Sequence, residues 1–140
     1  MKWNIPHEQD WSRVARRVAA ALKPGSIFAL QGPLGAGKTA FVQALAKELG
    51  AKRTPKSPTF SMLRTYPVKH GSVRRMIHVD AYRIEDETDL IPLDLDAELS
   101  DGDAILVLEW PEQVKGWLKK RTHQVLSIKI KKDGREAVLR

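Results

Sequence analysis

The eight residues from Gly32 to Thr39, GPLGAGKT, constrain this chain more than any other segment. They match the pattern G-x-x-x-x-G-K-[ST] at every fixed position, which average residue usage would produce in on the order of 1% of chains of this length. An apolar run at residues 26–30 precedes them, and an apolar stripe with helical spacing follows from Lys38 to residue 49. A glycine-rich turn without a ligand is the alternative, and this context argues against it. The motif therefore predicts a strand, a phosphate-binding loop and a helix in that order.

Each residue type in this loop has a task in binding a nucleotide. Glycines allow backbone conformations in which successive N–H groups point at one anion, and the free N–H groups of the helix start add to them. Lys38 can reach the β- and γ-phosphates, and the Thr39 hydroxyl can bind the Mg²⁺ ion that neutralises them. We expect cofactor-binding residues along the whole loop: Gly32, Pro33, Leu34, Gly35, Ala36, Gly37, Lys38, Thr39 and Ala40.

A magnesium ion at such a loop needs a carboxylate from a neighbouring strand, and two candidates exist. Asp80 ends the predicted strand at residues 74–80, and Glu109 ends the apolar run at residues 104–108. Glu109 follows the more apolar run, which favours it as the metal-linked residue, while Asp80 would orient a water or make a second magnesium contact. A solvent-exposed carboxylate at a strand end is the alternative for each. The expected metal residues are thus Thr39 and Glu109.

Two other features concern the γ-phosphate and the base. Thr59 lies after the predicted helix, where nucleotide switches place a threonine that senses the γ-phosphate, although Ser57-Pro58-Thr59 is equally typical of a simple turn. Guanine-specific switches use an Asn-Lys-x-Asp loop, and Asn4 is the only asparagine. We therefore expect ATP rather than GTP.

Two bulky residues stand beside the carboxylates. Trp110 follows Glu109 directly and either packs in the core or covers the site. His78 is interpreted as an ordinary strand residue without a catalytic role.

Length and composition limit the class of protein. A chain of 140 residues is sufficient for one domain that removes about 68% of its unfolded surface from water, so residues 1–140 are expected to form a single ATPase domain. The sequence has no cysteine, which excludes disulfides, thiolate nucleophiles and cysteine-based metal sites. It has no run of roughly 18 apolar residues and no signal-peptide pattern, so we expect no membrane association and a cytoplasmic location.

The net charge of +7 is unevenly distributed. Residues 80–112 contain twelve acidic side chains and one basic one, Arg83, so this segment carries −11 and the rest carries +18. Such segregation suits a polyanionic ligand on one side and a basic partner on the other, and two solvated faces without a partner are the alternative.

The order of elements indicates an α/β fold. A helix from Trp11 ends at Lys23-Pro24-Gly25, and residues 59–68 and 74–80 are predicted to form an antiparallel hairpin after the phosphate-loop helix. Short helical turns are expected at residues 85–100 and 111–120. Alternating apolar residues from Leu126, followed by Asp133-Gly134, predict a C-terminal hairpin.

Four motifs taken together resemble the TsaE family: GPLGAGKT, SPTF at residues 57–60, HVDAYR at residues 78–83 and LVLEWPE at residues 106–112. The similarity covers essentially the whole chain. TsaE proteins are bacterial ATPases required to form threonylcarbamoyladenosine beside the tRNA anticodon. The resemblance implies a three-layer P-loop NTPase fold with a mixed, mainly parallel sheet and a C-terminal hairpin. It also implies weak Mg²⁺-dependent ATP hydrolysis in isolation and action with the partners TsaB and TsaD, through which tRNA is reached indirectly.

The same resemblance implies roles for individual residues. Lys38 and Thr39 match the phosphate and magnesium positions, Thr59 the switch threonine, Asp80 the functional aspartate and Glu109 the metal-linked glutamate. The expected catalytic residues are therefore Lys38, Asp80, Glu109 and Thr59.

The resemblance is less specific for the base. Gly134, and the start of the first helix around Gln9 and Asp10, match stretches near the nucleotide base. Pro33 and Ala40 stand where relatives often carry an acidic residue and a second threonine, and neither change removes a phosphate-binding group.

Two other functions were weighed. Arg64, Arg74, Arg75 and Arg83 could supply charge for a small-molecule or nucleotide kinase, but the chain shows no room for an arginine-rich lid. A plain RNA-binding module could use the basic surface, and the absence of a basic–aromatic ladder argues against it.

Overall fold

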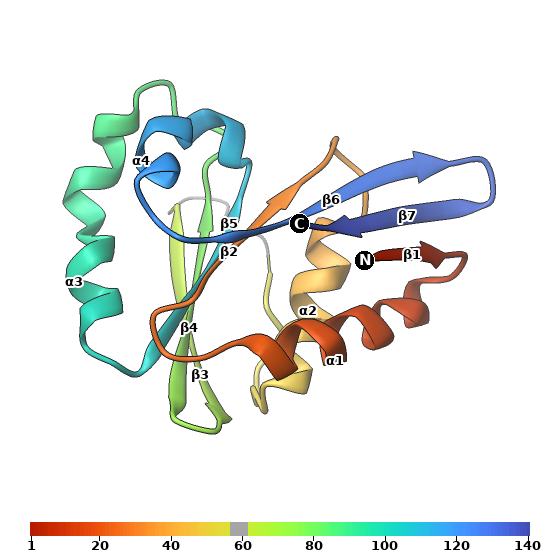
Figure 1. Cartoon of the computed structure of the whole chain (residues 1–140), viewed down its shortest axis with the longest axis horizontal. Helices are drawn as coiled ribbons and strands as arrows, with labels where there is room; N and C mark the ends of the chain where they lie inside the picture. Colours follow the sequence, from red (N-terminus) through yellow and green to blue (C-terminus); the bar gives the residue numbers. More distant parts are fainter. Residues whose placement is uncertain (57–61) are drawn as a thin grey trace.

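A computed structural model describes residues 1–56 and 62–140. Figure 1 shows a twisted central sheet with helices on both faces. The strands are β1 (Lys2–Ile5), β2 (Ile27–Gln31), β3 (Leu63–His70), β4 (Val73–Asp80), β5 (Ala104–Glu109), β6 (Gln124–Lys131) and β7 (Gly134–Leu139). The helices are α1 (Trp11–Ala21), α2 (Lys38–Glu48), α3 (Leu95–Ser100) and α4 (Lys115–Lys119), with 3-10 turns η1 (Glu8–Asp10), η2 (Glu87–Leu93) and η3 (Pro111–Val114).

The sheet has the strand order β1-β7-β6-β2-β5-β4-β3. Its four central strands, β6, β2, β5 and β4, are all parallel, while β3, β7 and β1 pair antiparallel at the two sides. Parallel strands that are covered on both faces consist almost entirely of apolar residues. This is why apolar and polar residues do not alternate in residues 104–108. The predicted mixed sheet with a C-terminal hairpin is confirmed.

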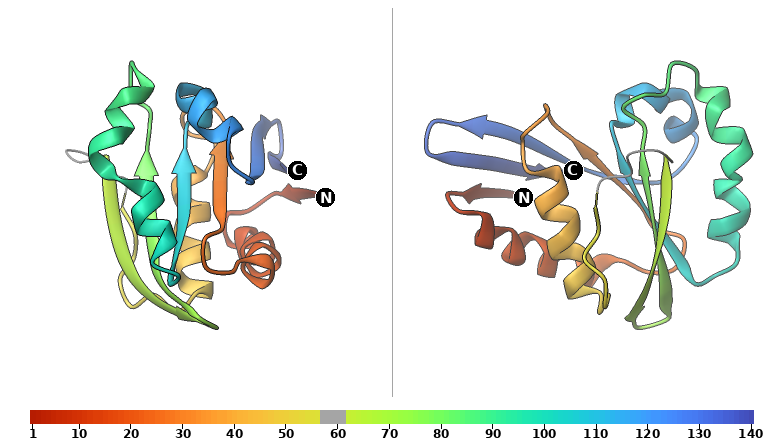
Figure 2. Two further views of the ribbon diagram at one scale, coloured as in Figure 1. Left: turned by 60° about the vertical axis from the view of Figure 1, so that its left-hand side comes forward. Right: turned by 180° about the vertical axis from the view of Figure 1, so that it is seen from behind.

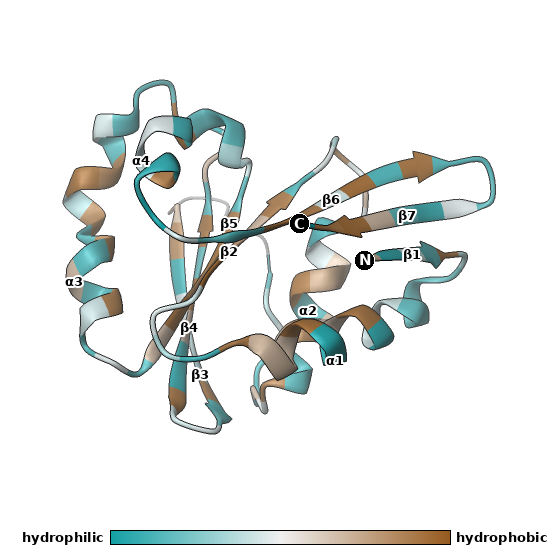
Figure 3. Cartoon of the chain, viewed as in Figure 1, coloured by the Kyte–Doolittle hydropathy of each residue, from teal (hydrophilic) through white to brown (hydrophobic). Residues whose placement is uncertain are grey.

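The sheet separates two hydrophobic clusters, which gives three layers (Figure 2). Along β5, Ile105 and Val107 face α1 and α2, whereas Leu106 and Leu108 face the opposite layer. This is the two-residue alternation of a strand. The two innermost strands, β2 and β5, are hydrophobic along almost their whole length, whereas the other strands and the helices are mixed (Figure 3).

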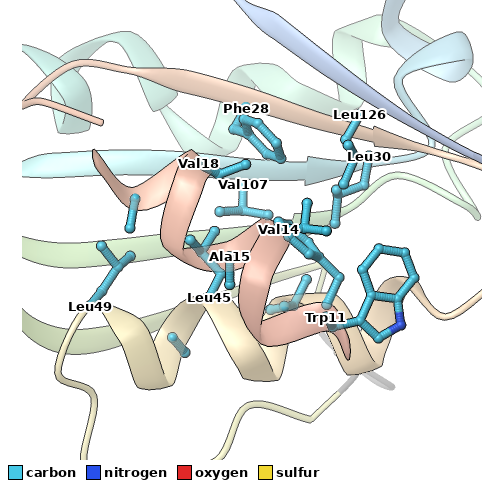
Figure 4. Packing of buried hydrophobic residues seen from close by; sticks show 14 of the residues in the cluster. Trp11, Val14, Ala15, Val18, Phe28, Leu30, Leu45, Leu49, Val107 and Leu126 are labelled. Atoms are coloured by element: carbon cyan, nitrogen blue, oxygen red, sulfur yellow. The ribbon is translucent and has the colours of Figure 1, made fainter. Parts of the chain in front are cut away.

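The hydrophobic cluster between the sheet and the helices α1 and α2 extends to the 32–37 loop, because Ala36 belongs to it; Figure 4 shows how other members pack. Val14 and Val18 of α1 meet Leu45 of α2 against the strands. Phe41 of α2 stacks on Phe28 at 5.8 Å and meets Trp11 edge-on at 5.7 Å between ring centroids. Such aromatic pairs contribute about 0.5–1.5 kcal/mol beyond their buried area, so they fix α2 firmly on the sheet.

Arginines neutralise part of the acidic segment within the molecule. Arg75 of β4 donates to Glu98 and to Asp103, and Arg121 pairs with Asp96. Arg75 thus ties α3 to the sheet, and Arg121 ties α3 to the segment that follows α4. These contacts explain part of the charge segregation without a binding partner.

The main differences from the sequence-based expectations lie at the ends of elements. Strand β1 was not predicted, because a four-residue edge strand carries too short a pattern, and it forms by pairing with β7. The expected strand at residues 59–68 begins at Leu63 within the described residues. Among the residues described, no helix is both long and apolar enough to cross a membrane.

Substitution of Gly134 tests how closely β7 packs against the end of β1. Its φ is +130°, and a Cβ there would lie 2.4 Å from the Ile5 carbonyl oxygen. Gly134→Ala should therefore lower the free energy of unfolding by roughly 2 kcal/mol or more beyond the effect of Gly25→Ala. Gly25 has a φ of +89° and open space around it, so its substitution carries backbone strain alone. Urea unfolding measures both, and equal losses would contradict the packing described for β1.

Candidate functional site

Three parallel strands end at one edge of the sheet and create the site. Strand β2 runs into the 32–37 loop, β4 ends at Asp80 and β5 ends at Glu109. Asp80 and Glu109 are direct register partners, and Glu109 is also the register partner of Leu30. Ligands of open α/β sheets bind at the carboxyl ends of such strands. The fold thus places both predicted carboxylates beside the phosphate loop.

The loop has the backbone expected for binding an anion. Gly35 and Gly37 have φ values of +78° and +106°, which side chains rarely adopt. A Cβ on Gly37 would lie 3.1 Å from the Trp11 indole, so the loop also packs tightly on α1. The helix α2 begins at Lys38 and directs its first N–H groups toward the loop.

The C-terminal hairpin holds the loop through hydrogen bonds and close packing. Arg135 of β7 donates to the carbonyl oxygens of Ala36 and Gly35, each at 3.1 Å. A Cβ on Gly32 would lie 2.9 Å from the Ile128 carbonyl oxygen of β6. The loop is therefore held between the hairpin and α2. Sequence patterns gave no sign of this role for Arg135.

A cavity of about 300 Å³ opens between the loop and the strand ends. It is lined by Leu34, Gly35, Gly37, Lys38, Thr39, Asp80, Tyr82, Glu109 and Trp110. The structure thus brings together Lys38, Thr39, Asp80 and Glu109. Thr59 lies outside the described residues, so its expected role stays a prediction.

Lys38 is held inside this cavity with 6% of its surface exposed. Its Nζ donates to the Gly32 carbonyl oxygen at 2.7 Å and lies 3.5 Å from the centroid of the Trp110 ring. Burial lowers the pKa of Lys38, and the charges of Glu109 and Asp80 oppose that change.

Trp110 covers the lysine and also packs against the hydrophobic cluster on the face of the sheet opposite to α1 and α2. Its φ of +61° is uncommon for a bulky residue, and Tyr82 packs against its ring at 4.9 Å. Both roles that the sequence left open for Trp110 are therefore present. Tyr82 was not predicted as a site residue.

The two carboxylates have different surroundings. Asp80 accepts a hydrogen bond from the Tyr82 backbone N–H at 3.0 Å, yet burial raises the pKa of Asp80 overall. Glu109 is 3% exposed, and its Oε2 lies 2.6 Å from Nε2 of His78. The interpretation of His78 as an ordinary strand residue missed this contact.

The residues fit a magnesium ion that is shared with phosphates. In the described part of the chain, no three histidine or acidic side chains converge to form a metal cage. Mg²⁺ usually needs only one or two protein oxygens when phosphates supply the others. The Thr39 hydroxyl and the Glu109 carboxylate line one cavity and supply that donor set.

A second cavity of about 380 Å³ lies across the loop and shares Gly35 and Gly37 with the first. Its lining includes Ile5, Pro6, His7, Glu8, Trp11, Ala40, Gly134 and Arg135. Apolar walls with a few polar groups suit a flat base. Gly134 lines this cavity, and so does Trp11 at the start of α1, while Gln9 and Asp10 are not among its lining residues. That these stretches lie near a nucleotide base stays a prediction.

The sequence also matches the profile of a known protein family. The profile of the family described as "Threonylcarbamoyl adenosine biosynthesis protein TsaE" matches residues 5–138. The chain belongs to the TsaE family. The resemblance drawn from the four motifs is therefore confirmed.

Individual TsaE proteins are similar over most of their length. The tRNA threonylcarbamoyladenosine biosynthesis protein TsaE of Bacillus subtilis (strain 168) is 33% identical over 136 residues, which are 97% of this chain and 82% of the relative. The protein of the same name from Aquifex aeolicus is 38% identical over 113 residues, which are 79% and 77% of the two chains. The crystal structure of Bacillus subtilis YdiB superimposes with a TM-score of 0.78 at 29% identity, covering 99% of this chain and 83% of that one.

The raised pKa of Asp80 makes a prediction for this TsaE-family protein without metal or nucleotide. A folded-state pKa above the unfolded value means that stability falls as pH rises through the interval between the two. Asp80→Asn removes the buried charge and keeps an oxygen for the Tyr82 N–H. It should raise the thermal midpoint by a few degrees at pH 7 in chelator-containing buffer, and the gain should vanish below about pH 3.9.

Asp89→Asn is the matched control, because Asp89 is an exposed aspartate of the acidic segment and its substitution removes the same charge. Scanning calorimetry should find little change for Asp89→Asn. A lower midpoint for Asp80→Asn at pH 7 would contradict the dominance of burial at Asp80.

Proposed function

We propose that this TsaE-family protein is a Mg²⁺-dependent ATPase that acts in the formation of threonylcarbamoyladenosine on tRNA. One observation carries the ATPase proposal: Lys38, Thr39, Asp80 and Glu109 converge on a single cavity beside an anion-binding loop. Family membership supports the place in tRNA modification, because the relatives carry that role in their names.

The side chains divide the work on the phosphates. The N–H groups of the loop bind the β-phosphate, and Lys38 exchanges its bond to the Gly32 carbonyl for the β- and γ-phosphates. Thr39 and Glu109 hold the magnesium ion, directly or through water. When bound, Mg²⁺ neutralises charge on the phosphate oxygens.

Asp80 is suited to handling the attacking water. Its register pairing with Glu109 supports a position beside the proposed magnesium ion, and its raised pKa makes it a better proton acceptor than an ordinary aspartate. Thr59 completes the proposed catalytic set as a contact for the γ-phosphate.

The base of ATP occupies the second cavity in this proposal. The two cavities share Gly35 and Gly37, so one nucleotide can extend from one to the other along the loop. Trp11 and Pro6 supply apolar walls, and Gly134 leaves room beside them.

The partners of this ATPase are TsaB and TsaD, and tRNA is reached through their complex. The exposure of Leu34 and Tyr82 supports the proposal that a partner binds at the site. Both line the first cavity, and they are 64% and 45% exposed. Exposed apolar side chains beside a binding site are typical of a surface that another protein covers.

The kinase alternative has less support. Arg74 and Arg75 stand at the start of β4, about 17 to 20 Å along the strand from Asp80. Arg75 is bound to Glu98 and Asp103, and Arg74 donates to the Gly71 carbonyl oxygen. Arg75 thus holds the acidic segment and Arg74 the β3–β4 turn, and both stand far from the phosphate cavity.

Reconstitution tests the proposed function. Purified chain should hydrolyse ATP slowly and release free phosphate, and a TsaB–TsaD complex should accelerate hydrolysis. Addition of tRNA and the other substrates should then increase the yield of modified adenosine. Hydrolysis and modification that do not respond to the partners would overturn the proposal, and a phosphorylated small molecule in place of free phosphate would favour a kinase.

Glu109 can be tested separately from binding. Glu109→Gln should lower turnover roughly 100-fold or more, because the amide is a weaker metal-linked and proton-accepting group, while a fluorescent ATP analogue still binds. Glu85→Gln is the control, because Glu85 is an exposed carboxylate of the acidic segment. Unchanged turnover in Glu109→Gln would remove Glu109 from the mechanism.

A further inference from the structure

His78 is buried behind the site and contacts Glu109. The imidazole is 1% exposed, and Nε2 lies 2.6 Å from Oε2 of Glu109. Its other nitrogen, Nδ1, is buried without a hydrogen-bond partner within the described part of the chain. The polar function of this side chain is thus directed at one atom of Glu109.

The register of two strands produces this contact. His78 of β4 pairs with Val107 of β5, so Glu109 stands two residues further along the neighbouring strand. Val107 packs in the cluster under α1 and α2, and alternation places Glu109 on that same face. Met76 belongs to the same cluster, which places His78 on that face of β4. The ring therefore reaches diagonally across to the carboxylate, on the α2 side of the sheet.

The direction of the hydrogen bond follows from the surroundings of the two ring nitrogens. Nδ1 is buried without a hydrogen-bond partner in the described part of the chain, whereas Nε2 faces Oε2 of Glu109 at 2.6 Å. The hydrogen of the neutral ring is therefore satisfied only on Nε2, which donates it to Oε2. The opposite tautomer would set two lone pairs against each other at 2.6 Å. With Oε2 engaged, Oε1 is left for the metal and its water.

We propose that His78 is a positioning residue: its Nε2–H fixes the Glu109 carboxylate so that one oxygen faces the magnesium and water positions. This inference rests on the proposed ATPase function for its effect on turnover, but the geometry holds without any ligand. Hydrogen-bonded partners of metal-linked groups typically change metal affinity or activity 10- to 100-fold when they are removed.

Two amide variants separate the hydrogen bond from mere occupancy of the site. The amide nitrogen of His78→Gln reaches the place of Nε2, whereas the shorter side chain of His78→Asn ends near the place of Nδ1. Both bury an uncharged amide, so a comparable thermal midpoint for the two shows that the fold is kept. Only His78→Gln should keep Glu109 oriented.

The first measurement needs neither metal nor nucleotide. In protein labelled with ¹⁵N at histidine, ring spectra should show His78 as the Nε2–H tautomer, and the signal is assigned by its loss in His78→Gln. Glu109→Gln should shift this signal, while Asp89→Asn should leave it in place. A wild-type Nδ1–H tautomer, or a signal indifferent to Glu109→Gln, would overturn the inference.

The second measurement determines how ATP turnover depends on the Mg²⁺ concentration. His78→Asn should raise the Mg²⁺ concentration needed for half-maximal turnover, or lower kcat, by about 10- to 100-fold, and His78→Gln should recover most of the loss. The affinity for ADP without Mg²⁺ should stay within about twofold in both, because Lys38 and the loop are untouched. The role of His78 would be overturned if both variants had the same Mg²⁺ requirement and kcat, or if His78→Asn lost no activity while the wild type hydrolyses ATP. Either result would leave the proposed function standing.

Failure of the proposed function has a different signature. If the wild type hydrolyses no ATP, the Mg²⁺ dependence of binding a fluorescent ATP analogue decides on His78, with the same pair of variants. A wild type with neither turnover nor Mg²⁺-dependent binding overturns both proposals.

Discussion

The parallel register of β2, β5 and β4 is the constraint on which the rest of the site depends. Because Glu109 is the register partner of both Leu30 and Asp80, the phosphate loop and two carboxylates end at one edge of the sheet. A shift of one residue in β5 would turn Glu109 to the opposite face and bring Leu108 beside the loop. Buried apolar side chains on both faces of β5 prevent such a shift, so the core that stabilises the fold also sets the geometry of the chemistry.

The C-terminal hairpin adds a second constraint, this time on the loop itself. Arg135 binds two loop carbonyls, and β6 approaches Gly32 closely. A phosphate-binding loop needs N–H groups that are oriented before the ligand arrives. Because Arg135 binds carbonyl groups of the loop, the N–H groups of the loop remain available to an anion. The loop is thus supported by a residue 99 and 100 positions away from the carbonyls that it binds, and the strand β7 that carries this residue is itself paired with β1.

Local signals predicted much of this structure. The glycine spacing, the apolar runs and the Asp133-Gly134 turn identified the loop, the central strands and the hairpin, because each depends on neighbours in sequence. The contacts of His78 and Arg135 depend on register between distant strands, which no local pattern contains. Strand β1 was missed because its four residues carry too short a pattern, and its partner β7 lies at the other end of the sequence.

The electrostatics of the cavity show why these groups need so rigid a frame. Burial lowers the pKa of Lys38 and raises that of Asp80, so the surroundings disfavour the charged form of both. Opposite charges close together offset part of that cost, and so does the Trp110 ring over the lysine. In a polarisable, flexible site the same charges would relax toward water and lose their effect on a ligand. Because the strand ends hold these groups in place, they keep a strong electric field inside the cavity, and a preorganised field of this kind is the condition for electrostatic catalysis.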